Sequence, residues 1–142
     1  MRLITLTNGI YSCQVAPEFG GSIFSFDCMT EHGKQPLLRR THEAAYLITD
    51  FASWPLVPFS NRIKYGQFRF MDRQYRIPVN YLGYPHASHG QAWERSWQID
   101  SVSNDSCLLT FLWKDLEFWP FPYKTSQKIT LGDDGLTLVL TL

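Results

Sequence analysis

Two short segments of the chain carry side chains suited to binding a polar ligand, Asn61-Arg62 and His89-Gly90. The guanidinium of Arg62 is a rigid fork of donors, and the amide of Asn61 both donates and accepts hydrogen bonds. The imidazole of His89 donates, accepts or titrates near neutral pH, and Gly90 allows the backbone to approach a ligand closely. With Trp93 as an aromatic wall, this set favours a neutral, polyhydroxylated ligand.

Each of these residues also has an ordinary structural explanation. Taken alone, Arg62 is typical of a surface salt bridge or of a side chain that fastens a loop, and His89 of a loop histidine bonded to backbone. We nevertheless predict that Asn61, Arg62 and His89 converge in one concave pocket, because they occupy two loops that flank one hairpin. The tryptophans either fill a β core or line a sugar pocket; they are Trp54, Trp93, Trp97, Trp113 and Trp119.

Other kinds of site find less support in the sequence. His86 and His89 stand three residues apart, but the surrounding proline and glycine favour a loop, and no carboxylate or thiol lies at ligand spacing. No metal is therefore expected. A serine nucleophile lacks the Gly-x-Ser-x-Gly elbow, and Gly20-Gly21-Ser22 lacks the lysine of a phosphate loop. Arg39-Arg40 is either a solvated pair or a phosphate clamp.

The candidate residues need elements that hold them together. Residues 54–63 and 84–93 contain prolines and a glycine, which are unfavourable inside a strand. Both segments are therefore predicted to be loops at one end of a sheet. Between them, residues 64–78 alternate like a hairpin that turns at Met71-Asp72. A second hairpin is predicted at Asn8-Gly9, because this pair favours the positive φ angles of a tight turn.

The rest of the chain alternates like short antiparallel strands. About ten strands with regular turn signals are typical of an all-β protein, and we predict an antiparallel β-sandwich with little helix. We expect Phe24 and Phe26 on one face of their strand, and at most one or two helical turns in residues 41–51, capped by Thr41. The predicted strands are residues 2–7, 10–15, 22–27, 35–39, 66–70, 73–78, 97–102, 106–113, 123–131 and 136–142.

Composition limits the classes of function. The 142 residues are 44% hydrophobic and 18% charged, which suits one soluble domain over residues 1–142. Thirteen basic and thirteen acidic residues cancel, so neither a nucleic acid nor a membrane is an expected partner. The separated Cys13, Cys28 and Cys107 predict no disulfide framework and, with no signal-peptide core, favour the cytoplasm.

The last predicted strand alternates to Leu142 and stops without a turn or a polar tail. We therefore expect the natural chain to continue. A sandwich ending here would expose apolar faces and an unpaired strand edge, which predicts association with another chain. The remaining part of the protein would be the natural partner.

At Asn61-Arg62 and His89-Gly90 the sequence resembles the aldose 1-epimerase, or galactose mutarotase-like, family. The segment Pro58-Phe59-Ser60-Asn61-Arg62-Ile63 is similar to the family's Asn-Arg segment. His89-Gly90, followed by Trp93 and Trp97, is similar to its His-Gly segment. Gly20-Gly21-Ser22-Ile23, residues 118–123 and the hairpin at residues 133–135 are similar to further parts of the family, in the same order.

The resemblance implies a sandwich of the supersandwich kind, of which residues 1–142 would be the N-terminal half. It also implies interconversion of the α and β anomers of a free hexose such as glucose or galactose. In the family a glutamate removes the proton of the anomeric hydroxyl and a histidine protonates the ring oxygen, without metal or organic cofactor. Asn61, Arg62 and His89 would bind the sugar, His89 would also help to place the ring oxygen, and Trp93 would contact the ring.

The family's acid and base have no counterpart among these residues. Both come later in the chain of family members, whereas no histidine follows His89 here, and Glu94 and Glu117 lie in other contexts. The 142 residues alone are therefore expected to be inactive. The alternatives are a non-catalytic carbohydrate-binding β-sandwich, a hexose-6-phosphate 1-epimerase, and a structural β domain that pairs with another chain through its edges.

Overall fold

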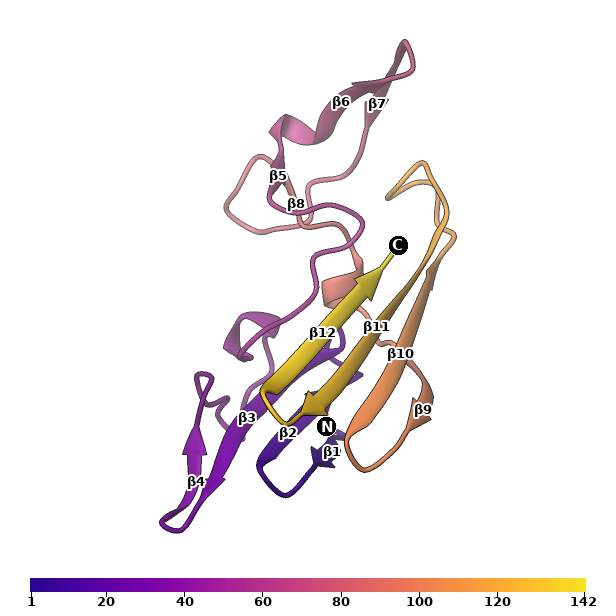
Figure 1. Cartoon of the computed structure of the whole chain (residues 1–142). Coiled ribbons are helices and arrows are strands. Elements are labelled where there is room, and N and C mark those ends of the chain that lie inside the picture. Colours follow the sequence, from indigo (N-terminus) through magenta and orange to yellow (C-terminus); the bar gives the residue numbers. More distant parts are fainter.

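The computed structural model describes residues 1–142, and two antiparallel four-stranded sheets dominate it (Figure 1). The first sheet has the order β1-β2-β3-β4, and the second has the order β12-β11-β10-β9. In the first sheet the strands are β1 Ile4–Thr7, β2 Tyr11–Ala16, β3 Ser22–Thr30 and β4 Gly33–Pro36. In the second they are β9 Gln98–Val102, β10 Ser106–Trp113, β11 Tyr123–Gly132 and β12 Gly135–Thr141.

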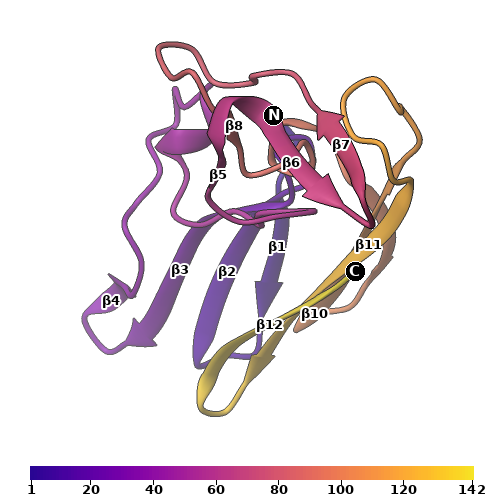
Figure 2. The ribbon, with the colours of Figure 1, turned by 90° about the horizontal axis from the view of Figure 1, so that it is seen from above.

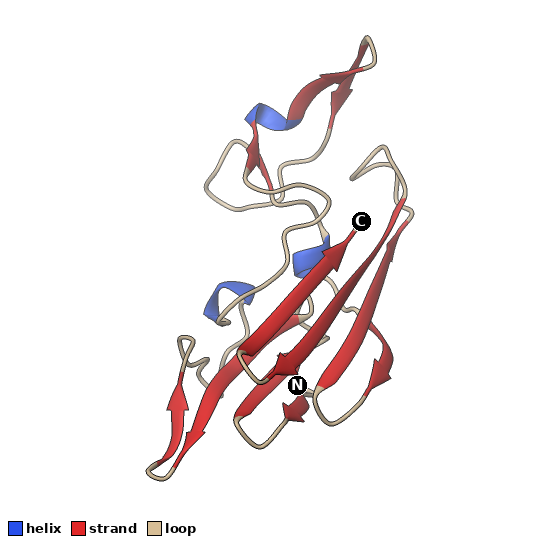
Figure 3. Cartoon of the chain, in the orientation of Figure 1, coloured by secondary structure: helices blue, strands red, loops and turns tan.

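Two short antiparallel pairs lie together at one end of the sandwich, on the opposite side from β4 (Figure 1). They are β5 Arg62–Ile63 with β8 Ala87–Ser88, and β6 Gln67–Phe70 with β7 Arg73–Arg76. Helix is confined to the short 3₁₀ turns η1 Ile48–Asp50, η2 Lys64–Gly66 and η3 Ala92–Glu94 (Figure 3). None of these turns has the length and apolar character that a membrane crossing requires.

The two large sheets face each other across one apolar core (Figure 2). Leu6 and Val15 enter it from the first sheet, and Leu109 and Ile129 enter it from the second; all four are fully buried. Burial of such side chains stabilises the fold by about 1.5–3 kcal/mol each. This packing confirms the predicted antiparallel β-sandwich.

The predicted hairpin turns form where local residue chemistry favours them. The side-chain oxygen of Asn8 accepts hydrogen bonds from the amides of Ile10 and Tyr11, which closes the turn between β1 and β2. Met71-Asp72 joins β6 to β7, and both residues have positive φ, at 44° and 59°. Two consecutive left-handed residues are the geometry of a tight hairpin turn.

The prediction that Phe24 and Phe26 share a face of β3 is wrong. The pairing of β3 with β2 shifts by one residue between Gln14 and Val15, so β3 holds an extra residue there. Phe24 packs with Phe51 in a small second cluster, whereas Phe26 packs in the main core. A bulge of this kind moves successive side chains to different surroundings because it interrupts the two-residue alternation.

The segment after β3 also differs from its prediction. The strand expected at residues 35–39 is β4, which ends at Pro36 because the amides of Leu37 and Leu38 both donate to the carbonyl of Phe26. No helix begins at Thr41, whose hydroxyl is buried without a hydrogen-bond partner. The helical turn in this region is η1, and the carboxylate of Asp50 closes its start by accepting hydrogen bonds from the amides of Tyr46 and Leu47.

Candidate functional site

The short pair β5–β8 brings the two predicted loops together. Arg62 lies opposite Ser88 in this pair. Just before β5, the carbonyl of Asn61 accepts a hydrogen bond from the amide of His89 at 2.9 Å. The amide of Asn61 donates in turn to Nδ1 of the His89 ring, also at 2.9 Å. Asn61, Arg62 and His89 are therefore neighbours, although 28 positions separate Asn61 from His89.

The backbone is left-handed at three positions of this arrangement, with φ of 65° at Asn61, 62° at His89 and 71° at Gly90. Asparagine and histidine tolerate this region better than most side chains, and glycine adopts it freely. At Gly90 a side chain would also overlap the carbonyl of Val57 and the ring of Pro58. Gly90 thus makes room for a contact within the chain, where we had expected it to make room for a ligand.

The hydrogen bond from Asn61 determines the tautomer of His89. A neutral imidazole carries its proton on only one nitrogen, and Nδ1 accepts a hydrogen bond here. The proton therefore lies on Nε2, which becomes a donor for an oxygen of a bound molecule. The sequence shows that a histidine is present, but the partner on the other loop decides which nitrogen donates.

The surroundings of His89 keep its ring neutral. Burial lowers the pKa of His89 below its ordinary value of 6.5, and the positive charge of Arg62 lowers it further. Both causes disfavour the protonated form, the first by removing water and the second by repulsion. Near neutral pH, His89 thus offers one N–H donor without a positive charge.

Arg62 and His89 line one small pocket of about 140 Å³. Arg62 lies over the ring of Tyr84, 4.8 Å from its centroid, which is a cation–π arrangement. The full lining is Thr49, Trp54, Arg62, Tyr81, Tyr84, Ser88, His89 and Trp93. Donors and aromatic rings are therefore present, but no carboxylate lines this pocket.

Trp93 supports the pocket from beneath. Its ring is 2% exposed, its indole N–H donates to the carbonyl of Gly90 at 3.0 Å, and it meets the His89 ring edge to face. A ring buried to this degree offers little area to a sugar. Tyr81 and Tyr84, which are 38% and 47% exposed, present more aromatic surface at the same pocket.

Asn61 and Asn80 both act on the loop of His89 from outside the pocket lining. Asn61 bonds the His89 ring through its backbone, and its exposed side chain makes no hydrogen bond. The Asn80 side chain makes three, accepting from the amide of Ser88 and donating to the carbonyls of Ser88 and Gly90. Asn80 therefore holds the backbone on both sides of His89. Sequence reasoning missed it because a lone asparagine in a loop belongs to no motif.

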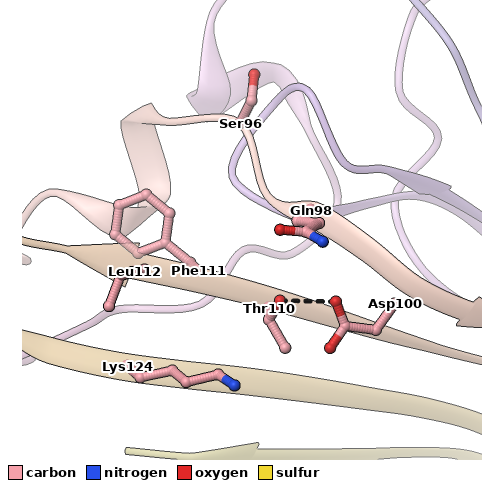
Figure 4. Close-up of a pocket in the computed structure, with 7 residues that line it drawn as sticks. All are labelled: Ser96, Gln98, Asp100, Thr110, Phe111, Leu112 and Lys124. Atoms are coloured by element: carbon pink, nitrogen blue, oxygen red, sulfur yellow. Dashed lines mark hydrogen bonds between the residues drawn. The ribbon is translucent and has the colours of Figure 1, made fainter.

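A second hollow, of about 570 Å³, lies elsewhere and contains none of the predicted site residues (Figure 4). It lies on β9, β10 and β11, where Thr110 donates to the carboxylate of Asp100 at 2.9 Å. No group of three or more histidine, cysteine, aspartate or glutamate side chains in the chain is arranged to hold a metal ion. The candidate site is therefore the pocket of Arg62 and His89.

Titration of His89 tests the electrostatics of this pocket. We expect NMR to show a pKa for His89 below 6.5, because burial and Arg62 both disfavour the charged ring. Arg62→Ala should raise this pKa part of the way, since burial remains. Because the unfolded chain takes up this proton at higher pH, stability should fall as pH decreases from 6.5 toward the folded-state pKa.

The control for this titration is Lys64→Ala, which removes a positive charge from outside the pocket lining. It should leave the pKa of His89 unchanged. A pKa for His89 at or above 6.5, or the same response to both substitutions, would contradict the assignment to burial and Arg62.

Comparisons with known proteins agree on one family. The sequence model of the family described as "Aldose 1-epimerase" matches residues 2–141. The uncharacterized protein YphB of Escherichia coli K12 is 32% identical over 142 residues, which are 100% of this chain and 46% of YphB. The chain thus spans a little under half the length of this curated relative.

Solved structures give the same result. A crystal structure from Escherichia coli K12, named as a candidate aldose 1-epimerase, superposes with a TM-score of 0.86 at 32% identity, over 98% of this chain and 45% of its own. The structure of a GalM/aldose epimerase homologue from Caenorhabditis elegans has a TM-score of 0.78 at 21% identity, over 93% of this chain and 42% of its own. The second likeness shows the fold alone.

Proposed function

The chain belongs to the aldose 1-epimerase family, and from this premise we propose that it supplies sugar-binding residues to an enzyme that interconverts the α and β anomers of a free hexose. The observation that carries the proposal is the pair formed by Asn61 and His89 beside Arg62, because it places two different hydrogen-bond donors at one aromatic-lined pocket. Glucose and galactose are the proposed substrates.

Each residue of the pocket can make a different contact with a bound sugar. The fork of Arg62 donates to hydroxyl oxygens, and its stacking on Tyr84 holds the guanidinium at the pocket. The Nε2–H of His89 donates to the ring oxygen or to a neighbouring hydroxyl. Tyr81 and Tyr84 offer aromatic surface to the C–H groups of the sugar ring.

The chemistry of anomer exchange needs more than this pocket contains. Opening the ring requires one group to take the proton of the anomeric hydroxyl and another to protonate the ring oxygen. The pocket lining has no carboxylate, and no histidine follows His89 in the sequence. His89 therefore has a supporting role in this proposal, and the main acid and base are not among these residues. The proposed reaction uses no metal or organic cofactor.

The same observation favours one second candidate. A pocket with donors and aromatic rings but without a carboxylate also suits a β-sandwich that binds a carbohydrate without reacting with it. The two candidates share the binding step and differ in turnover, so binding and turnover have to be measured separately.

Sugar binding is tested through the tryptophans that line the pocket. Titration with D-glucose and D-galactose should change the tryptophan fluorescence saturably, because Trp54 and Trp93 lie at the pocket. Arg62→Ala and His89→Ala should each weaken binding by about 1–3 kcal/mol, since a bound hydroxyl loses its partner. That range corresponds to an affinity about 5- to 150-fold lower.

The matched control is again Lys64→Ala, which should bind as the unaltered chain does. Circular dichroism should show that all three variants stay folded. Absence of saturable binding, or equal weakening by Lys64→Ala and Arg62→Ala, would refute the assignment of the pocket.

A further inference from the structure

One short stretch of the chain, residues 80–90, supplies both aromatic surface and a hydrogen-bond donor to the pocket of Arg62. The rings of Tyr81 and Tyr84 come from the loop between β7 and β8 (Figure 1), and His89 directly follows β8. The amide of Tyr84 donates to the carbonyl of Tyr81 at 3.3 Å, which closes a turn within the loop. The two ends of the loop need a separate connection, because this turn does not join them.

The side chain of Asn80 makes that connection at the base of the loop. Its Oδ1 accepts a hydrogen bond from the amide of Ser88 at 2.7 Å. Its Nδ2 donates to the carbonyl of Ser88 at 2.8 Å and to the carbonyl of Gly90 at 2.9 Å. A carboxamide has one acceptor oxygen and two N–H donors, so these three bonds use the oxygen and both donors.

Asn80 acts on β8 as a neighbouring strand would. On one side β8 pairs with β5, and there the amide of His89 donates to the carbonyl of Asn61. Because backbone groups alternate sides along a strand, the amide and the carbonyl of Ser88 point to the other side. On that side Asn80 bonds both of them. The short strand β8 is therefore held between β5 and one side chain.

This pattern of bonds suits asparagine better than any related side chain. Aspartate has the same size but no N–H donor, so it would place an oxygen against the carbonyls of Ser88 and Gly90. Glutamine carries the same amide on a side chain that is one methylene longer. Alanine makes none of the three bonds. The position thus requires the amide group of asparagine at this particular distance from the backbone.

The bonds from Asn80 reach the residues before and after His89. The backbone of His89 has φ of 62°, a conformation that is unfavourable for a residue with a side chain and persists only where the surroundings hold it. The same backbone directs the ring so that its Nδ1 accepts from the amide of Asn61. A change in the backbone at His89 would therefore move the ring and its Nε2–H together.

We propose that Asn80 is a positioning residue for the pocket of Arg62 and His89. Its amide ties the start of the loop, next to Tyr81, to the backbone on both sides of His89. The aromatic surface and the Nε2–H donor then face one bound molecule. Asn80 does not line the pocket, so it acts through these neighbours. The inference rests on the proposed function for the identity of that molecule as a sugar, whereas the placement of His89 does not depend on it.

The substitution Asn80→Ala tests the role of this amide. NMR of the unaltered chain should show His89 as one neutral tautomer, with the proton on Nε2. In Asn80→Ala both neutral tautomers should be present, because the bond from Asn61 loosens. The pKa of His89 should rise toward 6.5, since a looser loop admits water to the ring. The affinity for D-glucose and D-galactose should fall at least about fivefold.

The matched control is Asn8→Ala. The side chain of Asn8 also makes three hydrogen bonds to the backbone, with the amides of Ile10 and Tyr11 and the carbonyl of Gly132. It lies at the turn between β1 and β2 and does not line the pocket. Asn8→Ala should lower the free energy of unfolding much as Asn80→Ala does. It should leave the tautomer and pKa of His89 and the affinity for sugar unchanged.

The isosteric Asn80→Asp provides a second variant in case Asn80→Ala does not fold. It keeps the acceptor for the amide of Ser88 and loses both donors, so it should change the tautomer, the pKa and the affinity in the same directions. A folded Asn80 variant with an unaltered His89 ring would overturn the proposal. The same change at His89 in Asn8→Ala would also overturn it.

Loss of the whole fold in both Asn80 variants would overturn the proposal as well, because Asn80 would then be required by the entire domain. A chain that binds neither sugar would refute the proposed function instead. The NMR signals of His89 are measured without sugar, so they would still decide whether Asn80 positions this ring.

Discussion

Fresh α-glucose is expected to mutarotate at its spontaneous rate in the presence of the 142-residue chain alone. Ring opening needs a base for the anomeric hydroxyl and an acid for the ring oxygen, and each such group typically contributes about 10²- to 10⁴-fold. The pocket that holds Arg62 and His89 has no carboxylate in its lining. The Nε2–H of a neutral His89 can orient an oxygen, but it has no paired base across the pocket.

Polarimetry of freshly dissolved α-glucose and α-galactose measures this directly. The chain alone should add little to the spontaneous rate even when fluorescence shows that the sugar is bound. A full-length member of the aldose 1-epimerase family with measured activity serves as the positive control and should accelerate the reaction. Measuring binding on the same sample excludes an unfolded chain as the cause of inactivity.

Mutarotation by the 142-residue chain well above the spontaneous rate would contradict this expectation. It would direct attention to Glu94, Glu117 and His86. Glu94 lines a separate hollow that Trp93 also borders. His86 accepts a hydrogen bond from the amide of Tyr65 through its Nδ1, as His89 does from Asn61.

Gly90→Ala is expected to destabilise the fold by at least about 2 kcal/mol, because two unfavourable effects add. The backbone at Gly90 is left-handed, with φ of 71°, and a new Cβ would overlap the carbonyl of Val57. That carbonyl already accepts hydrogen bonds from the amides of Gln91 and Ala92, so it cannot move away without breaking them. The loop of His89 would have to shift, and the hydrogen bond from the Asn61 amide that fixes the tautomer of His89 would weaken.

Gly83→Ala is the matched control for this substitution. Gly83 is also left-handed, with φ of 83°, but no atom lies within 4 Å of the position that a Cβ would take. Gly83→Ala should lower the free energy of unfolding only by the cost of placing a side chain on left-handed backbone, about 1–2 kcal/mol. Urea unfolding of the two variants measures the difference, and NMR of the His89 ring reports on the loop. Equal destabilisation by the two substitutions would show that the contact with Val57 has no energetic role.

Local chemistry explains why part of the fold could be predicted from the sequence. The turns at Asn8-Gly9 and Met71-Asp72 depend on residues that accept left-handed backbone or bond to their own loop. The alternation of apolar residues in β10 and β11 has a period that only a strand satisfies. The neighbourhood of Asn61, Arg62 and His89 followed from two loops that flank one hairpin.

The sequence by itself determined most of the longer strands, their turns and the types of side chain that the site contains. It did not predict the short strands β5 and β8, which lie in segments that were expected to be loops. Only the tertiary structure decided that Phe24 packs outside the main core and that Gly90 makes room for the carbonyl of Val57. It also decided that Trp93 is buried against the His89 ring. It also decided the tautomer of His89 and the three hydrogen bonds of Asn80. Each of these features depends on a contact between residues that are distant in the sequence. Such a contact forms only once the chain has folded, so the neighbouring residues in the sequence do not predict it.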